Sequence, residues 1–120
     1  MTERDARAFL ADMIRACRDI IAALGEMSLE EFAADQIRQK AVIRDLEVLG
    51  EAAANLTPAI RGLDRSIPWS TIKSMRNKLI HEYFGVDARI VYRAATVEIS
   101  ALLPQLEQLF DQVERTARKI

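Results

Sequence analysis

The residues best suited to chemistry lie together in the segment RNKLIHEY, from Arg76 to Tyr83. The segment contains the only histidine of the chain, His81, with an arginine, an asparagine, a lysine and a tyrosine close by. A histidine, with an unperturbed pKa of about 6.5, can take up and release a proton at neutral pH. An arginine presents a planar fork of N–H groups to the oxygens of a phosphoryl group. The segment therefore predicts proton transfer at a phosphate, with Arg76 and His81 as candidate catalytic residues.

The residues around His81 allow two interpretations. A lone histidine near the end of a helix is often only a favourable cation at the negative pole of the helix dipole. Asn77, however, precedes His81 by one helical turn, so its amide lies on the same face and can hydrogen-bond the imidazole. Lys73 and Lys78 share a helix with Arg76, and the three cations would repel one another if they served only solubility. These groups favour a phosphate site, in which Asn77 supports His81 and the two lysines contact a phosphate group.

Charge is unevenly distributed along this chain of 120 residues, whose net charge is −1. Between Arg61 and Lys78, five basic residues accompany one acidic residue. A basic patch on a nearly neutral protein suits a confined phosphate site better than binding along a nucleic-acid duplex. Outside this segment, Glu51 is either a solvated helix charge or a carboxylate that supports the site by orienting Arg76.

Composition limits the class of protein. Half of the residues are hydrophobic, but the apolar runs are short, so we expect no membrane-spanning helix. The charged N-terminal segment MTERDARAF does not resemble a secretory signal, and a single cysteine cannot form an internal disulfide; both favour a cytoplasmic protein. One cysteine and one histidine, far apart, cannot build a transition-metal site. We therefore expect one domain, residues 1–120, with no metal and no cofactor.

Apolar residues recur at steps of three and four along the chain, which predicts amphipathic helices. We expect them over residues 5–24, in a short segment after residue 28, from 35 to about 56, from 68 to about 84, and from 88 onwards. Thr57 and Pro58 should end the long helix, and residues 61–66 should form a connecting loop. The connections are short, so neighbouring helices should be antiparallel. The predicted fold is all-α, an up-and-down bundle of four or five helices.

Single residues refine this outline. Ser28 and Glu31 form a capping box, and Asp35 and Asp87 are candidate N-caps. Pro104 should kink the last helical segment or begin a new helix. Within that segment the apolar stripe, placed by its spacing, consists of Ile90, Val91, Ala94, Val97 and Ala101.

Two residues of the expected core have a specific interpretation. Gly50 interrupts a run of strong helix formers, at a cost of about 1 kcal/mol relative to alanine, and this favours close approach of another helix. Cys17 belongs to the apolar stripe of the first helix, where we expect a buried and inert thiol.

The segment RNKLIHEY resembles the Arg-x4-His-x-Tyr signature of the HEPN superfamily, and specifically of its HepT-like toxins. The resemblance extends to LGEAAANL at 49–56, to the Ile67-Pro68-Trp69 run and to YFGVD at 83–87, so it covers essentially the whole chain. It implies a helical homodimer with metal-independent ribonuclease activity. It also implies a cognate antitoxin of the minimal nucleotidyltransferase type.

The resemblance assigns roles to residues of the segment. Arg76 and His81 would be the catalytic pair, and Tyr83 the residue to which the antitoxin attaches AMP. Arg76 and His81 are five positions apart, about 140° around one helix, so a single helix cannot easily aim both at one phosphate. Two copies of the helix facing a common cleft could do so, which favours a symmetric dimer. Apolar residues clustered about this helix would form its two-fold interface: Trp69, Ile80, Tyr83 and Phe84.

RNA carries its own nucleophile, the 2′-hydroxyl group, so a nuclease without a metal needs only to position it, move protons and stabilise charge. The expected function is that of a toxin that cleaves RNA in this way and is neutralised by AMP transfer to Tyr83. The alternative is a non-catalytic helical module that binds a nucleotide or a nucleotidyltransferase partner. A purely structural bundle is the third interpretation.

Overall fold

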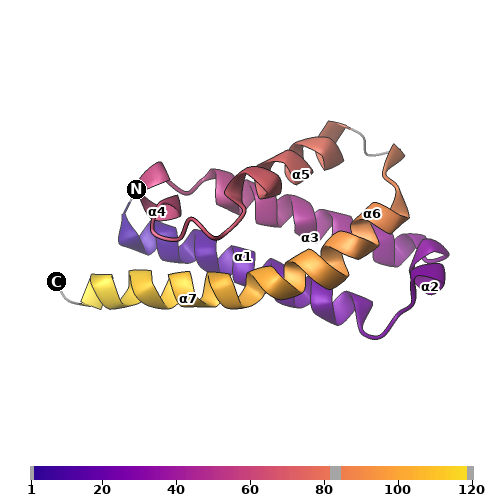
Figure 1. Ribbon diagram of the computed structural model, residues 1–120, viewed down its shortest axis with the longest axis horizontal. Helices are drawn as coiled ribbons and strands as arrows, with labels where there is room; N and C mark the ends of the chain where they lie inside the picture. Colours follow the sequence, from indigo (N-terminus) through magenta and orange to yellow (C-terminus); the bar gives the residue numbers. More distant parts are fainter. Residues whose placement is uncertain (1, 82–84, 119–120) are drawn as a thin grey trace.

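The computed structural model describes residues 2–81 and 85–118 of the chain. Within these ranges every regular element is a helix (Figure 1), which confirms the all-α prediction. The four longest helices are α1 (Glu3–Leu24), α3 (Gln36–Ala54), α5 (Trp69–His81) and α7 (Ile99–Arg118). The shorter ones are α2 (Leu29–Ala33), α4 (Pro58–Arg61) and α6 (Ala88–Arg93), which leads into the π-helical turn η2 (Ala94–Glu98).

Successive long helices run in alternate directions along the longest axis of the molecule (Figure 1). Helix α1 packs against both α3 and α7, and α5 packs on the far side of α3. The core between these helices is apolar, and its largest fully buried side chains are Phe32, Leu10, Met13, Ile20, Ile67, Leu79, Leu106, Leu109, Val42, Val91 and Cys17. No helix within the described ranges has the length and apolar character needed to cross a membrane.

The predicted helix starts are confirmed. The Ser28 hydroxyl accepts a hydrogen bond from the backbone N–H of Glu31, and the Glu31 carboxylate accepts one from the backbone N–H of Ser28, which begins α2. The side chain of Asp35 caps α3 and that of Asp87 caps α6. These local hydrogen bonds satisfy N–H groups that would otherwise lack a partner at a helix end, which is why sequence alone could locate them.

The connection predicted over residues 61–66 lies between α4 and α5, but the short helix α4 before it was not predicted. Thr57 and Pro58 end α3 but begin α4, in which the Thr57 hydroxyl accepts a hydrogen bond from the backbone N–H of Ile60. Proline fits the first position of a helix because its missing N–H has no intrahelical partner there. The same two residues therefore stop one helix and start the next.

The predicted inward face is wrong at Ile90, which precedes η2 and is 45% exposed, and again after residue 94. Val97 is 59% exposed and Ala101 is exposed, whereas Ile99 and Leu102 are buried. The cause after residue 94 is η2, because a π turn contains more residues than an α turn and shifts every later side chain around the helix axis. Pro104 begins no new helix and lies inside α7.

Candidate active site on helix α5

Helix α5 is anchored by the residues that precede and begin it. Ile67 is buried, and the indole Nε1 of Trp69 donates hydrogen bonds to the carbonyl oxygens of Arg61 and Asp64, both at 3.0 Å. Farther along, Ile72 and Leu79 are buried, with α5 packed on α3. The apolar stripe thus fixes the rotation of α5 and decides which polar side chains face α3 and which face solvent.

Arg76 faces α3 at the position of Gly50. A β-carbon built on Gly50 would lie 2.4 Å from Arg76 Cβ and 2.9 Å from its Cγ, closer than two carbon atoms can approach. The predicted close approach of another helix at Gly50 is therefore confirmed, and the group that approaches is Arg76 itself. Any other residue in place of Gly50 would have to displace the base of this arginine side chain.

The guanidinium of Arg76 is held by a carboxylate of the same neighbouring helix. Its Nε lies 3.4 Å from Glu51 Oε2, and the Arg76 side chain is only 24% exposed while that of Glu51 is 64% exposed. Nε itself is buried and has no aligned hydrogen-bond acceptor within the described residues.

The other candidate residues lie on the outer side of α5. Asn77, Lys73, Lys78 and His81 are all exposed. Among the described residues no hydrogen bond joins Asn77 to His81. The structure thus places the two groups on one surface without linking them. Tyr83, the candidate for AMP attachment, lies outside the described residues.

The two lysines have different surroundings. Lys78 lies close enough to Asp87 to help lower the pKa of that carboxyl, although hydrogen bonds from Arg89 lower it more. Lys73 lines a hollow near the start of α5 that contains no acidic residue. The positive charge of Lys73 is therefore less compensated than that of Lys78.

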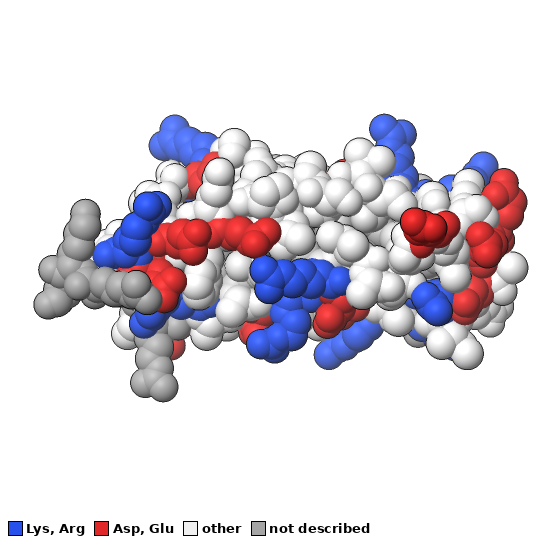
Figure 2. Space-filling view, turned by 90° about the horizontal axis from the view of Figure 1, so that it is seen from below, with Lys and Arg blue, Asp and Glu red and all other residues white. Residues whose placement is uncertain are grey.

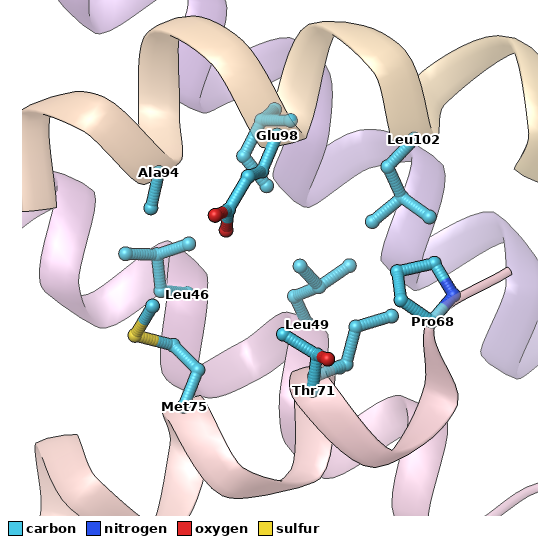
Figure 3. Close-up of a pocket in the computed structure, with 10 residues that line it drawn as sticks. Leu46, Leu49, Pro68, Thr71, Met75, Ala94, Glu98 and Leu102 are labelled. Carbon is cyan, nitrogen blue, oxygen red and sulfur yellow. The ribbon is translucent and has the colours of Figure 1, made fainter.

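Two further hollows flank α5. One, of about 310 Å³, adjoins Ile80 and Glu51 and is lined by Phe9, Asp12, Arg44, Glu47, Val48, Glu51, Ala52, Asn55 and Ile80. The other, of about 300 Å³, is mainly apolar and lies between α3, α5 and the turn η2 (Figure 3). The Glu98 carboxylate projects into this second hollow between the side chains of α3 and α5. Neither Arg76 nor His81 lines it, and a carboxylate repels phosphate, so it is not the candidate active site.

The arrangement supplies a fixed guanidinium, an exposed imidazole and exposed amide and ammonium groups along one helix. No group of three or more possible metal ligands occurs in the described part of the chain. The opposite face of the molecule, formed by α1 and α7, mixes acidic and basic side chains (Figure 2), as in the ion pair between Arg18 and Glu107. An anionic substrate is therefore expected to bind at α5 rather than on that face.

Sequence reasoning did not find the contact of Arg76 with Gly50, nor the lining of the hollow at Lys73 by Arg61 and Trp69. The signal for the first was the glycine itself, inside a run of helix formers. The second had no local signal, because it depends on how α4 and α5 lie relative to each other.

Comparison with known proteins identifies the family of the chain. The family profile described as Ribonuclease HepT-like matches residues 13–109, a range that includes both Arg76 and His81. A Thermococcus cleftensis protein named "Probable ribonuclease HepT" is 37% identical over 107 residues, which are 89% of this chain and 97% of that protein. Two Methanocaldococcus jannaschii proteins, each named as a candidate RNase, are 40% and 36% identical, each over 95% of this chain and over 98% and 94% of their own lengths. No solved structure matches the chain.

Proposed function

Because the chain belongs to the family of HepT-like ribonucleases, we propose that it is a toxin that cleaves RNA with Arg76 and His81 and is paired with a nucleotidyltransferase antitoxin. Ribonuclease activity follows from the family. The observation that supports Arg76 is its contact with Gly50 and Glu51, because only a glycine at position 50 leaves room for the base of this side chain. His81 is supported by its chemistry as the one histidine of the chain and by its exposed place on the same helix.

The proposed reaction needs one proton acceptor and one clamp for the phosphate. His81 takes the proton of the ribose 2′-hydroxyl, and the 2′-oxygen then attacks the adjacent phosphorus. The bond from phosphorus to the 5′-oxygen of the next nucleotide breaks, and that oxygen takes a proton from water. The protonated His81 gives its proton to the hydroxide left behind and returns to its starting state. Arg76 donates N–H groups to the phosphoryl oxygens as their charge increases. The products are a 2′,3′-cyclic phosphate and a free 5′-hydroxyl, and Asn77 supports the site by orienting His81.

A dimer would complete the site. Arg76 is held against α3 while His81 lies on the exposed side of α5, so the two groups of one protomer diverge. A second copy that packs near Ile80, which is 49% exposed, would bring His81 of one protomer towards Arg76 of the other. Trp69, which the sequence prediction counts with the interface, also donates two hydrogen bonds within its own protomer. Tyr83 and Phe84, the remaining members of the predicted interface, lie outside the described residues.

The proposed antitoxin acts on Tyr83. The chain has two tyrosines, and the other, Tyr92, is half-buried with its hydroxyl donating a hydrogen bond to the Met27 carbonyl at 2.7 Å. Tyr92 is thus occupied in holding the fold, which favours Tyr83 as the acceptor of AMP. The added phosphate would compete for the Arg76 clamp and the purine would obstruct the cleft. Tyr83→Phe should stay toxic but escape neutralisation, and an AMP adduct mapped to Tyr92 would contradict this assignment.

The decisive experiment compares RNA cleavage by the wild type, His81→Ala and Arg76→Lys, with EDTA present. The wild type should release fragments with 2′,3′-cyclic phosphate ends, and both variants should lose at least about 100-fold in rate, since lysine keeps the charge but lacks the planar fork. Circular dichroism should show that the variants remain folded. Cleavage that EDTA abolishes, or that leaves only 5′-phosphate ends, would contradict the mechanism.

A further inference from the structure

A hollow of about 270 Å³ lies where the end of α3, helix α4 and the first turn of α5 meet. Its lining residues are Ala53, Ala54, Arg61, Trp69, Ser70 and Lys73. It combines two cations, an indole and a hydroxyl group with small apolar residues. It is separate from the hollow beside Ile80 and from the apolar hollow of Figure 3, with which it shares no lining residue.

The charge of this hollow suits a phosphate. Arg61 and Lys73 line it, no acidic residue does, and neither cation forms an ion pair with a described residue. The hollow beside Ile80 has the opposite character, because three carboxylates accompany a single arginine there. Uncompensated cations around a concave surface attract anions more strongly than the same cations on a convex one.

Trp69 gives the hollow a rigid wall. Its two hydrogen bonds to carbonyl oxygens fix the indole against the connection between α4 and α5. Nucleobases of single-stranded nucleic acid are commonly held against aromatic side chains, with the adjacent phosphates on cations. The lining thus offers contacts to both parts of a nucleotide.

The hollow lies on the path of a strand that reaches the catalytic residues. Lys73, Asn77 and His81 follow at steps of four along the exposed side of α5. Eight residues of helix span about 12 Å, roughly the length of three to four stacked nucleotides. A strand whose scissile phosphate lies at His81 can therefore reach Lys73 without leaving α5.

We propose that this hollow binds one nucleotide of the RNA substrate away from the scissile bond, with its phosphate between Arg61 and Lys73 and its base or ribose against Trp69. The proposal rests on the proposed ribonuclease function, because it takes RNA as the ligand. It assigns Arg61, Trp69 and Ser70 to substrate binding and gives the enzyme a preference for strands long enough to reach the hollow.

The first test measures binding without cleavage. A 2′-O-methyl oligonucleotide of about eight residues lacks the attacking hydroxyl, and Trp69, the only tryptophan of the chain, reports on the hollow through its own fluorescence. Binding should change that fluorescence, and Arg61→Glu should weaken binding by about tenfold, as expected for the loss of one charged phosphate contact. The matched control is Arg65→Glu, an exposed arginine four residues away that does not line the hollow; it should weaken binding by less than about threefold through long-range charge alone.

The second test measures cleavage of RNA of increasing length. The kcat/KM of the wild type divided by that of Arg61→Glu should be larger for an eight-residue strand than for a dinucleotide. A dinucleotide bound at His81 cannot reach the hollow. Equal losses in Arg61→Glu and Arg65→Glu, or a ratio independent of length, would overturn the proposal while leaving the ribonuclease function intact. If the wild type cleaves no RNA but the two variants still differ in binding, the proposed catalysis fails and the nucleotide site stands.

Discussion

At the scale of single residues, the contact between Gly50 and Arg76 is the most specific feature of the site. Gly50→Ala would place a methyl group 2.4 Å from Arg76 Cβ, so α5 or the arginine must move. We expect RNA cleavage to fall by at least about tenfold, because displacement of a clamp by about 1 Å is costly to catalysis. The free energy of unfolding should change little. Overpacking costs about 1–3 kcal/mol, and the higher helix propensity of alanine offsets about 1 kcal/mol of that cost.

Gly85→Ala is the matched control for this substitution. Nothing lies within 4 Å of a β-carbon built on Gly85, and its backbone φ lies outside the region that favours glycine. Its activity and thermal midpoint should stay close to those of the wild type. Full activity in Gly50→Ala, measured beside this control, would show that the position of Arg76 is not critical.

Cys17 illustrates a residue whose role is purely structural. It is fully buried, which confirms the prediction from its place in the apolar stripe, and burial raises the pKa of its thiol from 9.0 to about 12. The folded state therefore favours the neutral thiol. Its contribution to stability is complete below pH 9 and is lost as the pH rises towards about 12.

The corresponding prediction concerns thiol labelling at pH 8. An aromatic disulfide reagent should label the folded protein only as fast as the chain unfolds, and should label it at once in guanidinium chloride, because the reactive thiolate is suppressed by burial. Rapid stoichiometric labelling of the folded protein would contradict the assigned burial.

At the scale of elements, local signals located helix starts but not the irregular turn. The N-caps at Ser28, Asp35 and Asp87 depend on side chains a few residues from the backbone groups that they satisfy, so the sequence contains the whole interaction. The turn η2 depends instead on how α6 and α7 pack on the rest of the bundle. That is why the stripe placed by spacing failed at Val97 and Ala101, and why Ile99 and Leu102 are the buried positions instead.

Contacts of Tyr92 hold helix α6 in position, and their contribution can be tested. The Tyr92 hydroxyl donates to the Met27 carbonyl after α1, and its ring contacts Phe32 of α2 with centroids 5.7 Å apart. Tyr92→Phe keeps the ring but leaves the carbonyl without this donor, so unfolding free energy should fall by about 1 kcal/mol. Denaturant titration measures the loss, and RNA cleavage should be unchanged. A much larger loss, or a loss of cleavage, would assign Tyr92 a role beyond holding α6.

At the scale of the whole molecule, the sequence proposed site residues but did not specify how they are arranged. The segment RNKLIHEY contains Arg76 and His81. Glu51 had two open interpretations, a solvated helix charge or a carboxylate that orients Arg76. The ion pair between Glu51 and Arg76 depends on α3 and α5 packing together, which their separate apolar stripes allow but do not specify. The hollow at Arg61 and Trp69 depends on the same packing and had no counterpart in the sequence pattern.

The proposed dimer can be tested through its effect on solution mass. Ile80→Glu places a charge in the proposed interface and should convert a dimer into a monomer in light scattering, because a buried unpaired charge is strongly unfavourable. Ile37→Glu is the matched control, since Ile37 is 81% exposed near the start of α3 and lines none of the three hollows beside α5. A wild-type monomer at tens of micromolar, or equal behaviour of the two variants, would contradict the proposed interface.

A shared cleft makes a stricter prediction about mixed dimers. Arg76→Ala and His81→Ala should each be inactive alone, but in a mixed dimer one cleft combines the intact Arg76 of one protomer with the intact His81 of the other. Random assortment gives half mixed dimers with one intact cleft each, so refolding an equal mixture should restore roughly a quarter of wild-type cleavage. Mixing the folded variants without exchange of subunits should restore none. If each protomer carried a complete site of its own, no mixture could recover activity. In that case Arg76 would act with a group other than the His81 of a second protomer, although the two side chains of one protomer diverge on α5.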